Sequence, residues 1–400
     1  MNLNRMWSSH RALKKRYDVV IIGGGVHGLA TAYYLGKRGI RDVAVIEKRY
    51  IGSGASGRNT AIIRANYRTS EGIAFYAESV RLYEALSKEL DYNVLFSQQG
   101  HLTLAHSDRA VNTLRERAET NRLMGVNSYL VGPEEIRGMV PAINIDHHTR
   151  TPILAALYHP PGGIIRHDAV VWGYARGADR MGVELHPFTT VTDIRVENGA
   201  VSGVVTDRGE IETKAVLNAT AGYCSTIAKM VGVDLPIVSH PLQALVTEPM
   251  KPLLDKVLVS SNLHVYINQT DRGEFVLGAE IDPYSCYSTR STLPFLEGCA
   301  GHALEIMPDL HKVRVLRQWA GVCDMTPDFS PIIGEVEEVR GFFVDVGWGT
   351  YGFKAGPVAG YRTAELIATG ETPDLIRPFA LSRFHEDRLV GEKAAAAVSH

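Results

Sequence analysis

The sequence predicts an α/β fold in which a βαβ unit of a parallel, doubly wound sheet is interleaved with a second, α+β domain. Three observations support this prediction. Residues Tyr17–Gly23 form a short, almost continuous apolar run, which is typical of a strand buried on both faces. The glycine-rich stretch Gly23–Gly28 (GGGVHG) follows at once, and Leu29–Arg38 has the apolar spacing of a helix. A second apolar strand, Val43–Ile46, ends on Glu47 and completes the unit.

The three spaced glycines of this unit indicate a phosphate-binding turn. Gly23 permits the tight turn after the strand, Gly25 allows the backbone to approach a pyrophosphate, and Gly28 allows close packing of helix on strand. The free N–H groups at the start of the following helix favour an anionic ligand. Glu47 lies about 20 residues beyond the last glycine, where a carboxylate can hold ribose hydroxyls. The unit is therefore interpreted as a Rossmann-like dinucleotide-binding domain.

Two further loops indicate which dinucleotide is bound. The stretch Gly52–Thr60 (GSGASGRNT) is small and polar, and it lies just beyond Glu47. Near the other end of the chain, Gly347–Lys354 (GWGTYGFK) is a second glycine-rich loop that opens a helical pattern. Two such loops on either side of a βαβ unit suit the two ends of one elongated cofactor. This favours a flavin dinucleotide over a nicotinamide one.

Strands and helices alternate along the rest of the chain without a long linker, so the domains are predicted to be discontinuous. Strands are expected at Leu102–Leu104, Val201–Thr206, Ala215–Asn218, His264–Asn268, Phe275–Leu277 and Gly341–Val346. Helices are expected at Gly72–Leu90, Asp108–Met124, His167–Met181 and Pro357–Ala368. The predicted organisation is an N-terminal arm (1–16), a dinucleotide-binding domain (17–95, 150–235 and 330–400) and a substrate domain (96–149 and 236–329).

The composition excludes several classes of function. The net charge of −2 gives no reason to expect a nucleic-acid partner, and no apolar run reaches the about 18 residues of a membrane span. The four cysteines are scattered without a CxxC pair, which argues against a zinc site or a disulfide framework and favours a cytoplasmic location. His27, His240 and His264 lie on different elements without ligand spacing, so no metal site is expected.

The chain resembles the glycine-oxidase and sarcosine-oxidase group of flavin-dependent amine oxidases, and within it the beta subunit of heterotetrameric sarcosine oxidase. The resemblance extends from about residue 17 to the C-terminus. The stretches that carry it are Tyr17–Gly28, Val43–Lys48, Arg58–Arg64, Phe96–Gln98, Arg166–Asp168, Ser239–Ala244, His264–Tyr266, Ser330–Ile333 and Gly347–Lys354. It implies a doubly wound flavin domain joined to a substrate domain that contains a large mixed sheet.

The resemblance also implies an activity and a set of partners. Noncovalently bound FAD would oxidise sarcosine (N-methylglycine) to glycine, and electrons would pass through a covalently bound FMN, shared with a partner subunit, to oxygen, giving hydrogen peroxide. The one-carbon unit would pass to tetrahydrofolate or leave as formaldehyde. The implied partners are alpha, gamma and delta subunits, of which alpha would bind NAD and tetrahydrofolate. The segment before the first strand is shorter than the family's pattern, which leaves docking through that arm open.

Two cationic residues are candidates for the catalytic site. Arg64 ends the apolar run Ala61–Arg64, and its guanidinium could hold a substrate carboxylate bidentately, unless it forms a structural ion pair. Lys354 follows the second glycine loop, and its ammonium could lie near the flavin pyrimidine or the carboxylate, unless it is a solvated loop lysine. The resemblance places both residues at the substrate.

The resemblance assigns cofactor contacts along the whole chain. His167 would be the attachment point of FMN, with Arg166 at its phosphate or ring, although a capping histidine is the simpler reading. Val191 would meet the adenine end of FAD through its backbone, and Cys323 is read as an inert thiol. The full set comprises Gly23, Gly25, Val26, His27, Gly28, Glu47, Lys48, Arg58, Asn59, Thr60, Ile62, Arg166, His167, Val191, Gly349, Gly352 and Lys354.

Two other functions remain open at this point. The homologous subunit of an N-methylglutamate dehydrogenase would share the fold and the flavin sites but accept a larger substrate. Tyr351 and the span Tyr284–Thr292 are the residues at which the two substrates would be distinguished. A noncatalytic flavoprotein that relays electrons is the third possibility, although such a protein needs no carboxylate clamp of Arg64 and Lys354.

Overall fold

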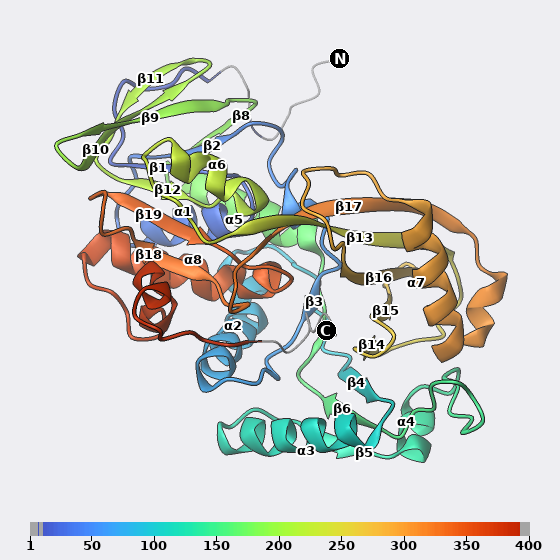
Figure 1. Ribbon diagram of the computed structural model, residues 1–400. Coiled ribbons are helices and arrows are strands. Elements are labelled where there is room, and N and C mark those ends of the chain that lie inside the picture. Colours follow the sequence, from blue (N-terminus) through green and yellow to red (C-terminus); the bar gives the residue numbers. More distant parts are fainter. Residues whose placement is uncertain (1–6, 8–10, 393–400) are drawn as a thin grey trace, which may run out of the picture.

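A six-stranded sheet organises the nucleotide-binding part of the molecule (Figure 1). The computed structural model describes residue 7 and residues 11–392. All neighbouring strands of this sheet are parallel except the antiparallel edge pair β18 and β19. In spatial order the strands are β18 (Ile332–Glu335), β19 (Phe342–Val346), β12 (Val216–Asn218), β1 (Val19–Ile22), β2 (Val43–Glu47) and β8 (Glu184–Pro187).

Both faces of the six-stranded sheet are covered, as the apolar run at its centre predicts. Val19 and Ile21 of β1 pack in one core with four helices, whereas Val20 and Ile22 pack in another with a three-stranded antiparallel sheet. The helices are α1 (Val26–Lys37), α2 (Ser70–Glu89), α5 (His167–Arg180) and α8 (Gly352–Thr369). The small sheet comprises β9 (Val191–Glu197), β10 (Ala200–Thr206) and β11 (Gly209–Glu212).

The second large sheet has eight strands and is mixed, as the resemblance implies. Only β4 and β14 are parallel neighbours. In spatial order it comprises β17 (Val315–Met325), β13 (Val238–Pro249), β16 (Glu274–Ile281), β15 (Val265–Gln269), β14 (Val257–Ser260), β4 (His101–Ala105), β6 (Ala155–His159) and β5 (Tyr129–Val131). Helices α3 (Asp108–Leu123), α4 (Pro133–Met139), α6 (Cys224–Lys229) and α7 (Leu293–Ile306) and the two-stranded pair β3 (Ile62–Ile63) and β7 (Gly163–Ile164) complete the fold.

The predicted strands and helices are present, and one helix starts earlier than expected. Helix α8 begins at Gly352 and not at Pro357, which lies inside it. Proline has no N–H to donate to the carbonyl four residues earlier, so a helix through it leaves the Phe353 carbonyl unpaired. The Tyr83 hydroxyl donates to that carbonyl at 2.6 Å and replaces the missing bond. The early start therefore depends on a contact with a residue 270 positions away.

The division into domains stays a prediction, although two of its parts can be described. Strand β6 lies in the stretch 150–235 but pairs with β4 and β5 of the larger sheet. Most of the predicted arm (1–6 and 8–10) lies outside the described residues. Its last part contacts the nucleotide-binding part, where Arg11 pairs with Glu184 at 3.1 Å and Lys14 pairs with Asp42 at 2.7 Å.

The close approach at Gly28 yields a stability prediction. A Cβ atom at this position would lie 2.1 Å from the Gly23 carbonyl oxygen. We expect Gly28→Ala to lower the free energy of unfolding by about 1–3 kcal/mol, because backbone must move to admit the methyl group. Urea unfolding would measure the change. Gly138→Ala, in a helix with open space around it, is the control and should be neutral or slightly stabilising. Equal stability of the two variants would contradict the argument.

Candidate active site

One cavity of about 350 Å³ joins the two large sheets. It begins at the carboxyl ends of β1, β2 and β12 and reaches the inner face of the eight-stranded sheet. Ligands of parallel α/β sheets usually bind at the carboxyl ends of the strands. Predicted site residues that line it are Gly23, Gly25, Val26, His27, Glu47, Lys48, Arg58, Asn59, Thr60, Ile62, Arg64, Val191, Gly349, Gly352 and Lys354. Gly28 lies behind the turn, and Arg166 and His167 lie outside this lining.

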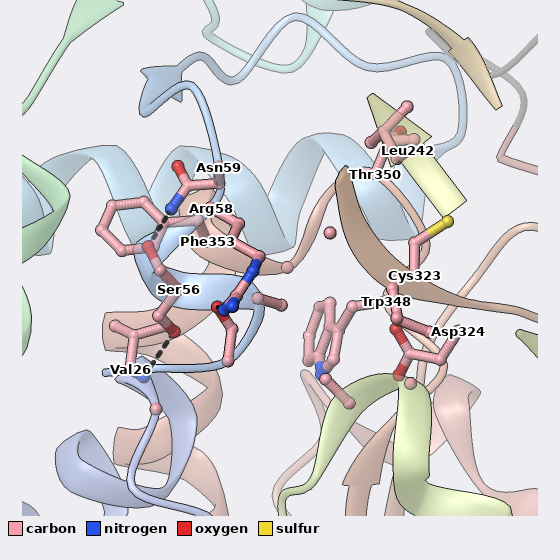
Figure 2. Close-up of a pocket in the computed structure, with 18 of the residues that line it drawn as sticks. Val26, Ser56, Arg58, Asn59, Leu242, Cys323, Asp324, Trp348, Thr350 and Phe353 are labelled. Carbon is pink, nitrogen blue, oxygen red and sulfur yellow. Dashed lines mark hydrogen bonds between the residues drawn. The ribbon is translucent and has the colours of Figure 1, made fainter. Parts of the chain in front are cut away.

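The first glycine loop presents backbone to the cavity. Gly23 has a φ of +114°, and the helix after it starts directly at Val26 without a side-chain cap from its own N-cap residue, Gly25. The Val26 N–H donates to the Ser56 Oγ at 2.9 Å (Figure 2). The Glu47 carboxylate accepts from the N–H groups of Gly24 and Arg49, at 2.9 Å each. The turn and its acidic residue are thus held in one rigid arrangement.

The small, polar loop Gly52–Thr60 forms one side of the cavity (Figure 2). The Asn59 side chain donates to the Ser56 carbonyl at 2.5 Å and accepts from the Ala61 N–H at 2.6 Å. The Arg58 guanidinium donates to the carbonyls of Ser53 and Gly54. The Trp319 indole N–H donates to the Arg58 carbonyl at 2.8 Å, which ties the loop to the eight-stranded sheet.

His27 connects the two glycine loops. Its Nδ1 lies 3.0 Å from the Asp345 Oδ2 and its Nε2 lies 2.8 Å from the Gly352 carbonyl oxygen. Both neighbours are acceptors, so both ring nitrogens donate only when the ring is a charged imidazolium. Burial alone lowers the pKa of His27, but the Asp345 carboxylate and the Gly352 carbonyl raise it above its ordinary value. The two acceptors and the raised pKa therefore favour an imidazolium, paired with Asp345, at the start of α1.

Arg64 has an unused hydrogen-bond donor in the cavity. Its side chain is buried, and its Nη1 donates to the backbone and side-chain oxygens of Asn66 at 3.0 and 2.9 Å. Its Nη2 is buried without a hydrogen-bond partner among the described residues, and no carboxylate there forms an ion pair with it. The alternative of a structural ion pair is therefore not observed, and one donor remains for a ligand.

Lys354 lines the same cavity from the first turn of α8. Its Nζ donates to the Thr350 carbonyl at 3.2 Å. Burial and the nearby Arg64 charge lower the pKa of Lys354 to about 7. Two cations that disfavour each other in a buried space indicate an anionic ligand, because an anion relieves the repulsion between them.

His167 and Arg166 form a separate group at the start of α5. The Arg166 guanidinium pairs with Asp168 at 3.1 Å and lies 4.0 Å from Asp271. The His167 Nδ1 is buried without a hydrogen-bond partner in the described part of the chain, and burial lowers the pKa of the ring. A neutral ring with an unused nitrogen fits a covalent attachment, which stays a prediction.

Several cavity residues escaped the sequence analysis. Ser56 lay in a recognised loop, but its bond to Val26 depends on the folded chain. The stretch Ala219–Gly222 follows β12 at the carboxyl edge of the sheet, and its small residues after a buried strand were a usable signal. His101 lies on a strand of the other sheet and had no local signal.

Cys323 lines the cavity with a buried thiol whose pKa burial raises to about 12, and its inertness stays a prediction.

The family was identified by comparison with known proteins. The family described as DAO, FAD dependent oxidoreductase, matches residues 18–366. The chain belongs to this family. It is similar to the beta subunit of sarcosine oxidase from Rhodobacter capsulatus, with 45% identity over 99% of this chain and 95% of that protein. The corresponding subunit from Arthrobacter sp is 44% identical over 97% of this chain and 96% of its own length. These matches confirm the resemblance inferred from the sequence.

Solved structures confirm the fold class. L-proline dehydrogenase from P. horikoshii superposes with a TM-score of 0.90 and 31% identity, covering 94% of this chain and 100% of that one. Glycine oxidase from Geobacillus kaustophilus gives a TM-score of 0.85 and 26% identity, covering 92% and 99%. The glycine turns, the start of α1 at the cavity and the Glu47 carboxylate fit an adenine dinucleotide, so this FAD-dependent oxidoreductase has a matching cradle. Among the described residues, no helix is both long and apolar enough to cross a bilayer.

The raised pKa of His27 predicts a pH dependence of stability. The interaction of protonated His27 with Asp345 stabilises the folded state fully below the ordinary histidine pKa of 6.5. This stabilisation is lost as the pH rises through the higher pKa that His27 has in the folded protein. We therefore expect wild-type protein to lose more unfolding free energy than His27→Gln between about pH 6 and about pH 9. Urea unfolding across this range would measure both. His148→Gln, at an exposed histidine, should follow the wild type, and parallel curves for wild type and His27→Gln would refute the charged assignment.

Proposed function

We propose that this chain is the flavin-bearing beta subunit of a multisubunit sarcosine oxidase and catalyses the oxidative demethylation of sarcosine to glycine. The observation that carries the proposal is the buried Arg64 Nη2, a donor without a partner among the described residues, in a cavity that Lys354 also lines. An α-amino acid supplies the carboxylate that both cations need. The names of the similar beta subunits support the substrate, and the family supports the cofactor.

The residues would act mainly by holding the substrate. The guanidinium of Arg64 and the ammonium of Lys354 would bind the carboxylate and fix the position of the neighbouring amine. The same two cations disfavour an ammonium, so they favour the neutral amine that oxidation requires. FAD, when bound by the glycine loops, supplies the acceptor for the two electrons. The protein contributes orientation, an apolar enclosure and control of the amine's charge.

The finer parts of the proposal concern a second flavin and the partner subunits. His167 would hold FMN covalently, and its buried Nδ1, which has no hydrogen-bond partner within residues 11–392, supports this assignment. FMN would supply a route for electrons to oxygen, with hydrogen peroxide as product. The partners would be alpha, gamma and delta subunits, with tetrahydrofolate or water receiving the one-carbon unit. A cytoplasmic location belongs to the same proposal, and the four unpaired cysteines accord with it.

Two alternatives can be separated from this proposal by a substrate screen. An N-methylglutamate dehydrogenase subunit would accept a larger substrate, and a relay subunit would accept none. Thr289 of the span Tyr284–Thr292 lines the cavity, so this span has access to a substrate's side chain. Anaerobic bleaching of the bound flavin by sarcosine supports the proposal. Faster bleaching by N-methylglutamate selects the first alternative, and no bleaching by any amino acid selects the second.

Removal of the Arg64 guanidinium tests the carboxylate clamp. We expect Arg64→Ala to raise the KM for sarcosine about ten- to hundred-fold, because a charge-assisted contact contributes about 1.5–3 kcal/mol. Steady-state kinetics would measure the change. Arg122→Ala, at an exposed arginine of α3 that pairs only with Glu119 among the described residues, is the control. An unchanged KM in Arg64→Ala would remove this residue from the site.

Replacement of His167 tests the second flavin. We expect His167→Ala to lose covalent flavin and to retain FAD, because the FAD cradle and His167 lie in different places. Acid precipitation separates the two cofactors, since FAD stays in the supernatant and an adduct remains with the pellet. Intact-mass analysis of the pellet would show an FMN-sized adduct in the wild type only. An adduct that persists in His167→Ala would place the attachment elsewhere.

A further inference from the structure

A second polar group faces the substrate end of the cavity from the eight-stranded sheet. His101 is the first residue of β4, and its side chain is 1% exposed. It lines the cavity together with Thr103, two residues further along the same face of the strand. Leu102 and Leu104 point to the opposite face, into the apolar core of this sheet. The strand thus directs its polar side chains at the space that Arg64 and Lys354 also line.

Neither ring nitrogen of His101 has a hydrogen-bond partner among the described residues. A buried polar atom left in this state is unfavourable, because it has lost its hydrogen bonds to water without replacing them. The histidine beside it provides the contrast: His159 of β6 is paired with His101 in register. The His159 Nε2 accepts from the Ala65 N–H at 3.2 Å, and its Nδ1 lies 2.7 Å from the Asn127 carbonyl oxygen. Of these two buried histidines, one is satisfied by the fold and the other faces the cavity unsatisfied.

The charges around His101 fix the chemistry that it offers. Burial, and then the charges of Arg64, His159, Arg117 and Lys354, hold the pKa of His101 well below its ordinary value. The ring is therefore neutral and carries one lone pair and one N–H. The same cations keep a substrate amine neutral, and a neutral secondary amine has a single N–H to donate. In a buried part of the cavity, that N–H needs an acceptor close to the carboxylate clamp.

We propose that His101 accepts a hydrogen bond from the N–H of the bound substrate and thereby selects secondary α-amino acids over tertiary ones. The inference rests on the proposed amino-acid oxidation and adds a specificity residue to it. N-monomethyl amino acids and proline carry the required N–H. An N,N-dimethyl amino acid in its neutral form has none, so it leaves the ring unsatisfied. The second ring nitrogen remains available to a water molecule.

Single-turnover reduction of the bound flavin tests this inference without an electron acceptor. The purified flavin-loaded protein, with any subunits that accompany it, would be mixed anaerobically with N-methylglycine or with N,N-dimethylglycine. We expect His101→Val to lower the ratio of the flavin-reduction rate constant to the apparent Kd for N-methylglycine about tenfold or more. The value for N,N-dimethylglycine should change less than about twofold, and His101→Gln, which restores an acceptor, should recover most of the loss.

A binding measurement separates the amine contact from a merely structural role. Methoxyacetate carries the carboxylate but no N–H, and its Kd, read from the perturbed flavin spectrum, should be the same in wild type and His101→Val. His148→Val, at an exposed histidine, is the matched control and should behave as wild type. An equal loss of reduction efficiency with both amines in His101→Val, or a larger Kd for methoxyacetate, would overturn this inference but not the proposed function. A wild-type protein that no amino acid reduces would overturn the proposed function and this inference with it.

Discussion

The two hydrogen bonds of His27 hold together parts of the chain that are 318 and 325 residues apart. His27 lies in the first turn of α1, Asp345 lies near the end of β19, and Gly352 begins α8. The same carboxylate accepts from the Trp348 indole at 2.7 Å, so one acidic side chain fixes both the histidine and the second glycine loop. This link adds to the pairing of β1, β12 and β19, the strands from which the two loops emerge. The nucleotide site is therefore built from both ends of the sequence, and its geometry requires the complete six-stranded sheet.

The electrostatics of the cavity change along its length. At the nucleotide end, the first glycine loop lines the cavity, His27 is hydrogen-bonded to Asp345 and Gly352, and the Glu47 carboxylate accepts from two backbone N–H groups. At the other end, Arg64 and Lys354 lie without an ion pair among the described residues. Arg117, buried nearby, donates to the Asn66 carbonyl that Arg64 also uses. Positive charge therefore accumulates where a small anion would bind, and the substrate itself would complete the charge balance.

The βαβ unit could be predicted from sequence because its signals are local. Strand, glycine turn, helix and Glu47 lie within 31 consecutive residues, Tyr17–Glu47, and each has a periodicity or a residue type of its own. The partners of the side chains could not be predicted in this way. Tertiary packing determines that Ser56 is the acceptor for Val26, that Tyr83 is the donor to Phe353, and that His101 has no hydrogen-bond partner in the described part of the chain. His101 begins one strand and His159 ends another, and only the folded sheet shows that they are neighbours with different hydrogen-bond partners.

The start of α8 shows how such a distant contact determines the chemistry of the site. Had the helix begun at Pro357, Lys354 would lie in a loop with a freely rotating side chain. Because Tyr83 donates to the Phe353 carbonyl and Ser79 donates to the Lys354 carbonyl, the helix begins at Gly352, and Lys354 occupies its first turn. A cation is unfavourable at the N-terminus of a helix, where the dipole is positive. This adds to burial and to the repulsion by Arg64, so the ammonium is destabilised until an anion is bound. The position of Lys354 thus disfavours its charged form in the free protein, and under the proposed function a bound carboxylate would relieve this cost.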